Sequence, residues 1–368
     1  MGVPFYNFHD LHHDSFKTEV KKRINDIIDN NAFVEGEYNQ KFEVEFAQKQ
    51  KSNHCLLVAN GTDALEIALL VHGVGAGDKV GVPGITFYAT AEAVLNVGAT
   101  PVWIDVDEKA GLLCPDSLKR VHEKHNLKAV MPVHIYGLPC PMDEINSFCS
   151  EKGIAVIEDA AQAQGTYYKE GSPVGDGPNL VTFSFYPTKN LSAFGDAGCI
   201  LTNDEKLAKK VITIRNHGRG DEAAMGRNSR CDHMQAAVLH AKLEEVDQFN
   251  KQRKEVAALY HKGLASLPFG LLPEKFLALS SWHLYPIQLP SIKHREELMN
   301  LLRSKDIGCT PFYEKALSQE EALQGYEGED TNAKNFAGRT LCLPMNPFLS
   351  QSDVDEVVGV ICEYANKL

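Results

Sequence analysis

Short apolar runs and longer amphipathic segments alternate along the chain from about residue 54 to residue 158. The apolar runs predict strands at 54–59, 79–83, 101–105, 129–135 and 154–158. The segments between them predict helices at 62–71, 89–96, 116–125 and 142–152. Apolar strands that alternate with helices indicate a mostly parallel sheet with helices on both faces. Ligands of such sheets bind beyond the carboxyl ends of the strands.

The pattern changes after about residue 230. Residues 232–264 predict a nearly continuous helix, and three further elements follow it: a strand at 283–288, a helix at 295–304 and a helix at 353–365. This second part reads as a smaller α+β domain. We therefore predict a large α/β domain over residues 1–250, which includes an N-terminal helical segment, and a small C-terminal domain over residues 251–368.

The first thirty residues hold two patterns. Residues 15–29 predict an amphipathic helix, with Ser15 as its N-cap and an apolar face of Val20, Ile24, Ile27 and Ile28. Just before it lies a cluster that resembles a set of metal ligands: His9, Asp10, His12, His13 and Asp14. No partner motif stands nearby, so we interpret the cluster as solvated polar chain and predict no metal.

Composition and charge narrow the function classes. The 368 residues are 43% hydrophobic and 23% charged, as in an ordinary globular protein. Lys and Arg number 37 against 49 Asp and Glu, and the net charge of −12 argues against a nucleic-acid partner. The chain starts without a basic region followed by a long apolar stretch, and no apolar run is long enough to span a bilayer. Nine scattered cysteines without a CxxC motif predict free thiols, and we expect a cytoplasmic protein.

A lysine and an acid each follow a predicted buried strand. Lys189 comes shortly after the apolar run 180–183, and Asp159 comes shortly after the run 154–157. An amine in such a place can form a Schiff base with the aldehyde of pyridoxal phosphate. A carboxylate can keep the pyridine nitrogen protonated, so that the ring accepts electrons. The pair predicts a pyridoxal phosphate enzyme.

Each of the other candidate residues near the expected strand ends has two possible interpretations. The segment Asn60-Gly61-Thr62-Asp63 is either a phosphate cradle at a helix N-terminus or a plain helix cap at Thr62. Ser184 is either a phosphate contact or a serine satisfied by nearby backbone. Phe87 either stacks on a flat ring or packs in the core.

Two further segments complete the candidates. The stretch 226–230 either supplies an amide and a guanidinium to an anionic ligand or forms a solvated loop. Residues 73–77, with glycine at every second position, resemble a dinucleotide-binding loop. They follow a predicted helix and precede a strand, which is the wrong order for that motif, so we interpret them as a helix end and a turn.

Taken together, the motifs resemble the DegT/DnrJ/EryC1/StrS family of pyridoxal phosphate-dependent sugar aminotransferases. The resemblance runs across nearly the whole chain, and the order and spacing of its motifs are highly specific. The motifs are FVEG at 33–36, NGTDAL at 60–65, ATPV at 99–102, HIYG at 134–137, IEDAAQ at 157–162, SFYPTKNL at 184–191, GDAG at 195–198, RNHG at 215–218, and NSR at 228–230 with QAA at 235–237.

The resemblance implies a type I pyridoxal phosphate transferase fold, like that of aspartate aminotransferase, in a homodimer with shared active sites. It also implies the site residues. Lys189 looks like the Schiff-base lysine and proton shuttle, and Asp159 like the partner of the pyridinium nitrogen. The other implied cofactor contacts are Gln162 at the ring or its hydroxyl, Phe87 on the ring face, Gly61, Thr62, Asp63 and Ser184 at the phosphate, and Asn228 at the phosphate from the other subunit. Arg230 would meet an anionic group of the donor or the sugar.

The resemblance further implies the reaction. Glutamate would donate the amino group, pyridoxamine phosphate would carry it, and a nucleotide-linked ketosugar would accept it, as in aminosugar biosynthesis for a surface polysaccharide or a glycosylated metabolite. The form Asn228-Ser229-Arg230 resembles members that act on 3-keto sugars more than the Asn-Tyr-Arg form of members that act at C4. Phe312 stands where many members have the histidine of a His-Tyr-Pro motif, which leaves open how Phe312 and Tyr313 contact the substrate.

Two rival functions remain beside the aminotransferase. A dehydratase of the same family typically has histidine in place of the Schiff-base lysine, whereas this chain has Lys189. A non-catalytic regulator that kept the fold need not retain both Lys189 and Asp159. The intact pair therefore favours the aminotransferase over either rival.

Overall fold

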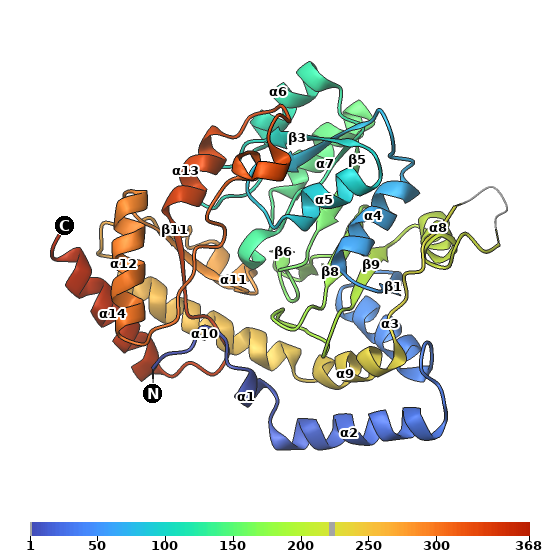
Figure 1. Ribbon diagram of the computed structural model, residues 1–368, viewed down its shortest axis with the longest axis horizontal. Helices are drawn as coiled ribbons and strands as arrows, with labels where there is room; N and C mark the ends of the chain where they lie inside the picture. Colours follow the sequence, from blue (N-terminus) through green and yellow to red (C-terminus); the bar gives the residue numbers. More distant parts are fainter. Residues whose placement is uncertain (1, 221–224) are drawn as a thin grey trace.

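The computed structural model describes residues 2–220 and 225–368, and its centre is a seven-stranded sheet (Figure 1). The strand order is β1-β9-β8-β5-β4-β2-β3. The strands are β1 (His54–Val58), β2 (Lys79–Pro83), β3 (Thr100–Ile104), β4 (Ala129–Val130), β5 (Ala155–Asp159), β8 (Leu180–Ser184) and β9 (Gly198–Thr202). Four of the neighbouring pairs are parallel, and β9 is antiparallel to both β1 and β8. The predicted mostly parallel sheet is confirmed.

Helices cover both faces of this sheet. One face packs against α4 (Gly61–Val71), α5 (Ala89–Asn96) and α8 (Glu205–Arg215). The opposite face packs against α3 (Glu37–Lys49), α6 (Pro115–His125), α7 (Met142–Lys152) and α9 (His233–Leu243). Helix α2 (Asp14–Asp29) lies outside this second layer, along α9 (Figure 1). Both faces of the sheet are therefore buried, as the continuous apolar runs along its strands predict.

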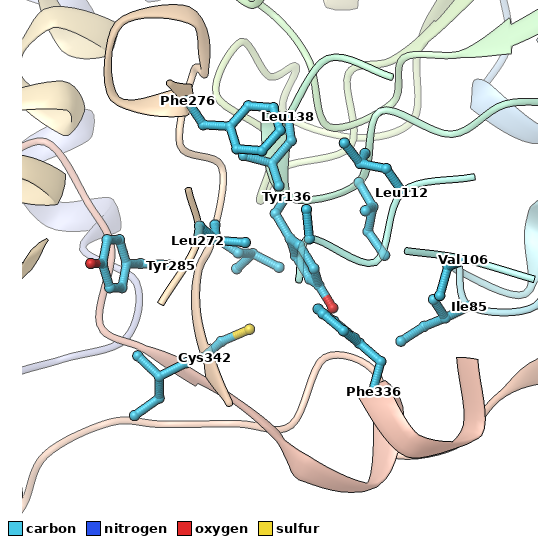
Figure 2. Packing of buried hydrophobic residues seen from close by; sticks show 14 of the residues in the cluster. Ile85, Val106, Leu112, Tyr136, Leu138, Leu272, Phe276, Tyr285, Phe336 and Cys342 are labelled. Atoms are coloured by element: carbon cyan, nitrogen blue, oxygen red, sulfur yellow. The ribbon is translucent and has the colours of Figure 1, made fainter. Parts of the chain in front are cut away.

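The C-terminal part is built on α10 (Val246–Leu264) and a two-stranded antiparallel sheet of β10 (Tyr285–Gln288) and β11 (Thr340–Leu343). Its other helices are α11 (Phe276–Leu279), α12 (Ile292–Ser304), α13 (Thr331–Arg339) and α14 (Gln351–Ala365). One apolar core joins this part to the large sheet. Figure 2 shows Tyr136, from a loop of the large sheet, beside Phe336 of α13, with the two rings stacked 6.3 Å apart. Helix α10 runs across residue 250, and the domain division there stays a prediction.

Short elements complete the chain. They are the helix α1 (Phe8–Leu11), the hairpin of β6 (Tyr167–Lys169) and β7 (Ser172–Pro173), and the 3₁₀ turns η1 (Ile135–Gly137), η2 (Leu317–Gln319) and η3 (Glu321–Leu323). Residues 73–77 form the turn between α4 and β2, as predicted, with Gly73 and Gly77 at positive φ. All nine cysteines are free, as predicted, and seven are buried, where a thiol packs as a small apolar side chain. Among the described residues, no helix has both the length and the apolar character to cross a bilayer.

Several boundaries differ from the prediction. The strand expected at 129–135 ends at Val130, because Pro132 cannot donate a ladder hydrogen bond and Tyr136 takes positive φ in a 3₁₀ turn. The helix expected at 232–264 is two helices, α9 and α10, which break at Glu244 and Glu245. Helix α2 begins one residue earlier than expected, with His13 rather than Ser15 as its N-cap, and Ile28 of its expected apolar face is exposed.

Candidate active site

Asp159 stands at the carboxyl end of β5 with only 5% of its surface exposed. One carboxylate oxygen accepts a hydrogen bond from the Thr90 hydroxyl (2.8 Å) and the other from the Ala161 amide (3.1 Å). Burial raises the pKa of Asp159, and these two donors and the nearby Lys189 amine partly offset the rise. Sequence reasoning missed Thr90. In the sequence, Thr90 was marked only by its position four residues after Thr86. In the structure, the hydroxyls of Thr86 and Thr90 lie 2.9 Å apart.

Lys189 lies in the turn after β8, with its backbone amide bonded to the carbonyl of Tyr186 (2.9 Å). The side chain is half-buried overall, with the amine enclosed by protein. Burial lowers the pKa of Lys189 to about 8, although the Asp159 carboxylate acts in the opposite direction. A larger share of this amine than of an ordinary lysine is therefore unprotonated near neutral pH, which favours its use as a nucleophile or proton acceptor.

Gly61 and Ser184 meet where β1 passes into α4. A Cβ placed on Gly61 would lie 2.6 Å from the Cβ of Ser184, so only glycine fits there. Strand β9 brings the two together, because Gly198 pairs with Val58 of β1 on one side and with Ser184 on the other. The N-terminus of α4, with its positive dipole end, therefore opens beside a serine hydroxyl, which is a suitable place for a phosphate.

The cap of α4 is Asn60, not Thr62. The Asn60 side chain accepts a hydrogen bond from the Asp63 amide (2.8 Å), so that amide is already used within the protein. The reading of Thr62 as a plain helix cap is therefore wrong. Of the predicted phosphate contacts, the structure brings Gly61, Thr62 and Ser184 together at the turn.

Gln162 connects the region of Asp159 to the C-terminal part. Its side-chain oxygen accepts from the Tyr136 amide (2.6 Å), and its side-chain nitrogen donates to the Tyr313 hydroxyl (3.0 Å). The Tyr136 hydroxyl in turn donates to the Phe312 carbonyl (2.6 Å). Phe312 thus takes part through its backbone here, while Tyr313 points to the site and burial raises its pKa.

The Phe87 ring lies near Tyr313, on the side of the candidate active site. It is 57% exposed and its centre lies 6.1 Å from that of the Tyr313 ring. The alternative that Phe87 packs in the core is therefore wrong. An exposed ring beside a buried carboxylate and an enclosed amine is suited to stack on a flat cofactor.

Residues 228–230 lie at the end of β1. Asn228 is exposed and pairs with Asn216, whose side chain accepts a hydrogen bond from Arg230 (3.2 Å). Ser229 is fully buried, and its hydroxyl accepts from the Ala59 amide (3.1 Å). The motif is thus anchored by Ser229, and it leaves Asn228 at the surface. The segment 226–230 is therefore not a simple solvated loop.

The residues of this site fit pyridoxal phosphate. The cradle that a Cβ at Gly61 would fill suits the phosphate, the buried Asp159 suits a pyridinium nitrogen, and the enclosed Lys189 amine suits the aldehyde. Phe87 offers an exposed ring face in the same region. Four separate elements thus supply one group for each part of the same molecule.

Comparison with known proteins gives the same class. Residues 14–362 match the DegT/DnrJ/EryC1/StrS aminotransferase family. A dTDP-3-amino-3,4,6-trideoxy-alpha-D-glucose transaminase of Streptomyces venezuelae is 34% identical over 100% of this chain and 97% of its own length. The crystal structure of S. venezuelae DesV with a ketimine intermediate superposes with a TM-score of 0.93, at 33% identity over 100% of this chain and 99% of that one. A pleiotropic regulatory protein of Geobacillus stearothermophilus is 36% identical over 99% of both chains.

The chain belongs to the DegT/DnrJ/EryC1/StrS aminotransferase family. It has the fold of the pyridoxal phosphate-dependent aminotransferases of that family. It is a pyridoxal phosphate-dependent sugar aminotransferase, and its relatives include several nucleotide-sugar aminotransferases.

Proposed function

We propose that the enzyme transfers the amino group of glutamate to carbon 3 of a nucleotide-linked ketosugar. The observation that carries the proposal is the Lys189 amine, whose pKa of about 8 suits proton transfer, beside the buried Asp159 carboxylate. The preference for carbon 3 rests on relatives. Proteins named as 3-amino or 3-oxo sugar aminotransferases are 32–34% identical over 94–100% of this chain.

The proposed roles follow from the positions of the side chains. When bound, pyridoxal phosphate supplies a carbonyl that condenses with amines and a ring that accepts the electron pair left at the reacting carbon. Lys189 Nζ then removes the α-proton of the amino donor and later returns a proton during amination of the sugar. Asp159, whose ionised form is favoured by hydrogen bonds from Thr90 and Ala161, keeps a proton on the pyridine nitrogen. Gly61, Thr62 and Ser184 hold the phosphate, with Asp63 next to them, and Gln162 and Phe87 orient the ring.

A second subunit completes the site in this proposal. Asn228 is exposed at the end of β1, where it is free to reach across a dimer interface to the partner's phosphate. Arg230, half-buried beside Asn216, offers a guanidinium to an anionic group of glutamate or the sugar nucleotide. Ser229 does not contact the sugar in this proposal. Its buried hydroxyl holds the Asn228–Arg230 segment against Ala59.

The product would be a nucleotide-linked aminosugar for a surface polysaccharide, such as a lipopolysaccharide O-antigen, or for a glycosylated metabolite. Relatives with such roles in their names include a spore coat polysaccharide biosynthesis protein of Bacillus subtilis and a GDP-perosamine synthase of Vibrio cholerae, both 32% identical to this chain. Nucleotide sugars are made in the cytoplasm, and we place the enzyme there.

The test is a panel of UDP-, dTDP- and GDP-linked 3-keto and 4-keto hexoses with glutamate, scored for aminated product and 2-oxoglutarate. We expect product from at least one 3-keto sugar and less from its 4-keto isomer. Lys189→Ala should lower the rate by about 10³-fold or more, whereas Lys119→Ala, an exposed lysine on α6, should leave it unchanged. Product from 4-keto sugars alone would refute the carbon-3 assignment.

A regulatory role is the second candidate, because a relative at 36% identity is named a pleiotropic regulatory protein. A regulator of this kind would bind pyridoxal phosphate without turning over glutamate or a sugar. The enclosed Lys189 amine and the buried Asp159 carboxylate favour catalysis, since neither is needed for binding alone. A yellow protein that releases no 2-oxoglutarate from glutamate would favour the regulator.

A further inference from the structure

The first residues of the chain do not hang free but lie against the C-terminal part before the chain enters α1 (Figure 1). Val3 is 1% exposed and its carbonyl accepts from the Gly308 amide (2.8 Å). The Gly2 amide donates to Asp306 (3.1 Å). Phe5 packs so closely on Gly308 that a Cβ there would lie 2.5 Å from the Phe5 nitrogen. We call residues 2–8 the N-terminal arm, and its start is firmly anchored.

Aromatic rings link this arm to the predicted cofactor site. Phe5 lies 6.1 Å from Phe312, and Phe312 lies 5.6 Å from Tyr313, measured between ring centres. Tyr313 in turn lies 6.1 Å from the exposed Phe87 ring and bonds to Gln162. This row of rings connects Phe5 of the arm to Phe87 through Phe312 and Tyr313.

Tyr6 brings the arm to the catalytic lysine. Its ring packs edge-on against Phe5 (4.8 Å) and is half-buried, and Thr188, the residue before Lys189, is among the groups around its hydroxyl. Burial raises the pKa of Tyr6 to about 12, with smaller effects from Cys342, Arg253, Thr188 and Tyr186 around it. The hydroxyl is therefore protonated at every pH at which the enzyme would work, and it can donate a hydrogen bond.

The chemistry of the arm distinguishes the two substrates. Residues 3–8 are Val, Pro, Phe, Tyr, Asn and Phe, without a charged side chain. Glutamate carries two carboxylates, which need cations or several donors. Arg253, a cation among the groups around Tyr6, is buried and donates to the carbonyls of Trp282 (3.4 Å) and Met345 (3.0 Å). A sugar ring offers C–H faces and hydroxyl groups, which suit aromatic rings and a phenol.

We propose that the N-terminal arm forms a wall of the substrate pocket and that Tyr6 contacts the sugar of the nucleotide-linked substrate. The Tyr6 ring packs against the C–H face of the hexose and its hydroxyl bonds to a sugar oxygen. The edge-on contact with Phe5 orients the ring, and Thr188 lies near its hydroxyl. This inference rests on the proposed function, since it names the residue that recognises the acceptor of that reaction.

The test measures the two half-reactions separately with Tyr6→Phe, which removes only the hydroxyl. We expect the KM for the best ketosugar of the panel to rise about tenfold, while the rate of 2-oxoglutarate release from glutamate changes less than about twofold. Tyr6→Leu, which also removes the ring plane, should raise the sugar KM further. Tyr364→Phe is the matched control, because its hydroxyl bonds to Glu297 of α12 instead.

A second measurement does not depend on turnover. Amide hydrogen exchange in residues 3–8 should slow when the ketosugar is added to the pyridoxamine phosphate form, and not when glutamate is added to the pyridoxal phosphate form. An unchanged sugar KM in Tyr6→Phe, or equal loss in both half-reactions, would overturn the inference while the proposed function stands. If the wild type released 2-oxoglutarate but aminated no sugar, the proposed function would fall, and this inference with it.

Discussion

Gly61 lies so close to Ser184 that a methyl group on Gly61 would come within 2.6 Å of the Ser184 Cβ. The contact joins the start of α4 to the end of β8, although the two residues are far apart in sequence. It sets the width of the turn to which we assign the cofactor phosphate. Any side chain at Gly61 must push β8 or α4 aside.

Gly61→Ala should therefore weaken both folding and cofactor binding. Overpacking of this kind lowers the free energy of unfolding by about 1–3 kcal/mol. We expect the affinity for pyridoxal phosphate to fall as well, because α4 moves away from Ser184. Urea unfolding of the apoprotein and titration with the cofactor measure the two effects. Gly75→Ala is the matched control, since its nearest neighbour would be the Val97 carbonyl at 3.8 Å.

Lys189 should react with amine reagents at a lower pH than surface lysines. Its pKa of about 8 predicts that labelling of the apoprotein, followed by peptide mass spectrometry, rises with a midpoint near pH 8. The exposed Lys119, whose pKa is raised by Asp116, should label only at much higher pH. Asp159→Asn removes the charge that raises the Lys189 pKa, so its midpoint should fall further. A midpoint for Lys189 equal to that of Lys119 would contradict the enclosed amine.

Glu158, the residue before Asp159, should contribute to the stability of the fold. Its carboxylate is 1% exposed and accepts from His134 Nε2 (2.7 Å), the Tyr168 hydroxyl (2.6 Å) and Asn179 (2.7 Å). The Cys140 amide donates to His134 Nδ1 (3.0 Å), which leaves the ring proton on Nε2. Glu158→Gln places an amide against these donors and should lower the free energy of unfolding by about 2–4 kcal/mol.

Denaturant unfolding of Glu158→Gln checks this value. The comparison is Glu151→Gln, which breaks an exposed pair with Lys152 and should leave unfolding unchanged. Equal unfolding midpoints for Glu158→Gln and the wild type would show that the buried cluster does not hold the end of β5.

Lys242 should make stability depend on pH. It is buried in α9, donates to the Ser192 hydroxyl (2.8 Å) and lies over the rings of Phe16 and Phe194. Burial lowers the pKa of Lys242 to about 7, against a small opposing effect of Glu245. Between pH 7 and the ordinary lysine pKa the unfolded chain binds a proton that the folded chain lacks, so this group makes stability rise with pH.

Lys242→Met removes that dependence. The melting temperature of Lys242→Met relative to the wild type should therefore be highest near pH 6–7 and fall as the pH approaches 10. Lys209→Met, which changes an exposed lysine on α8, is the control and should shift the melting temperature equally at all pH values. A pH-independent difference for Lys242→Met would refute the lowered pKa.

The alternation of apolar runs and amphipathic segments was enough to predict the parallel sheet, its order of elements along the chain and the helix at 15–29. These features depend on neighbours in sequence, and side-chain periodicity reports them directly. The same pattern placed Lys189 and Asp159 after buried strands, and hence at one edge of a sheet. The pattern did not predict the short strands β9 and β11, because their periodicity is weak. It also did not predict the break between α9 and α10.

Contacts between distant residues appeared only in the tertiary structure. Strand β9 sets Gly61 beside Ser184, Thr90 of helix α5 reaches Asp159 at the end of β5, and the buried Ser229 fixes the exposed Asn228. The Phe87 ring proved to be exposed, which no local pattern could decide. A sequence determines which side chains are available and how each short segment folds. Packing against segments hundreds of residues away decides which of them meet, because burial and pKa depend on the whole surroundings of a group.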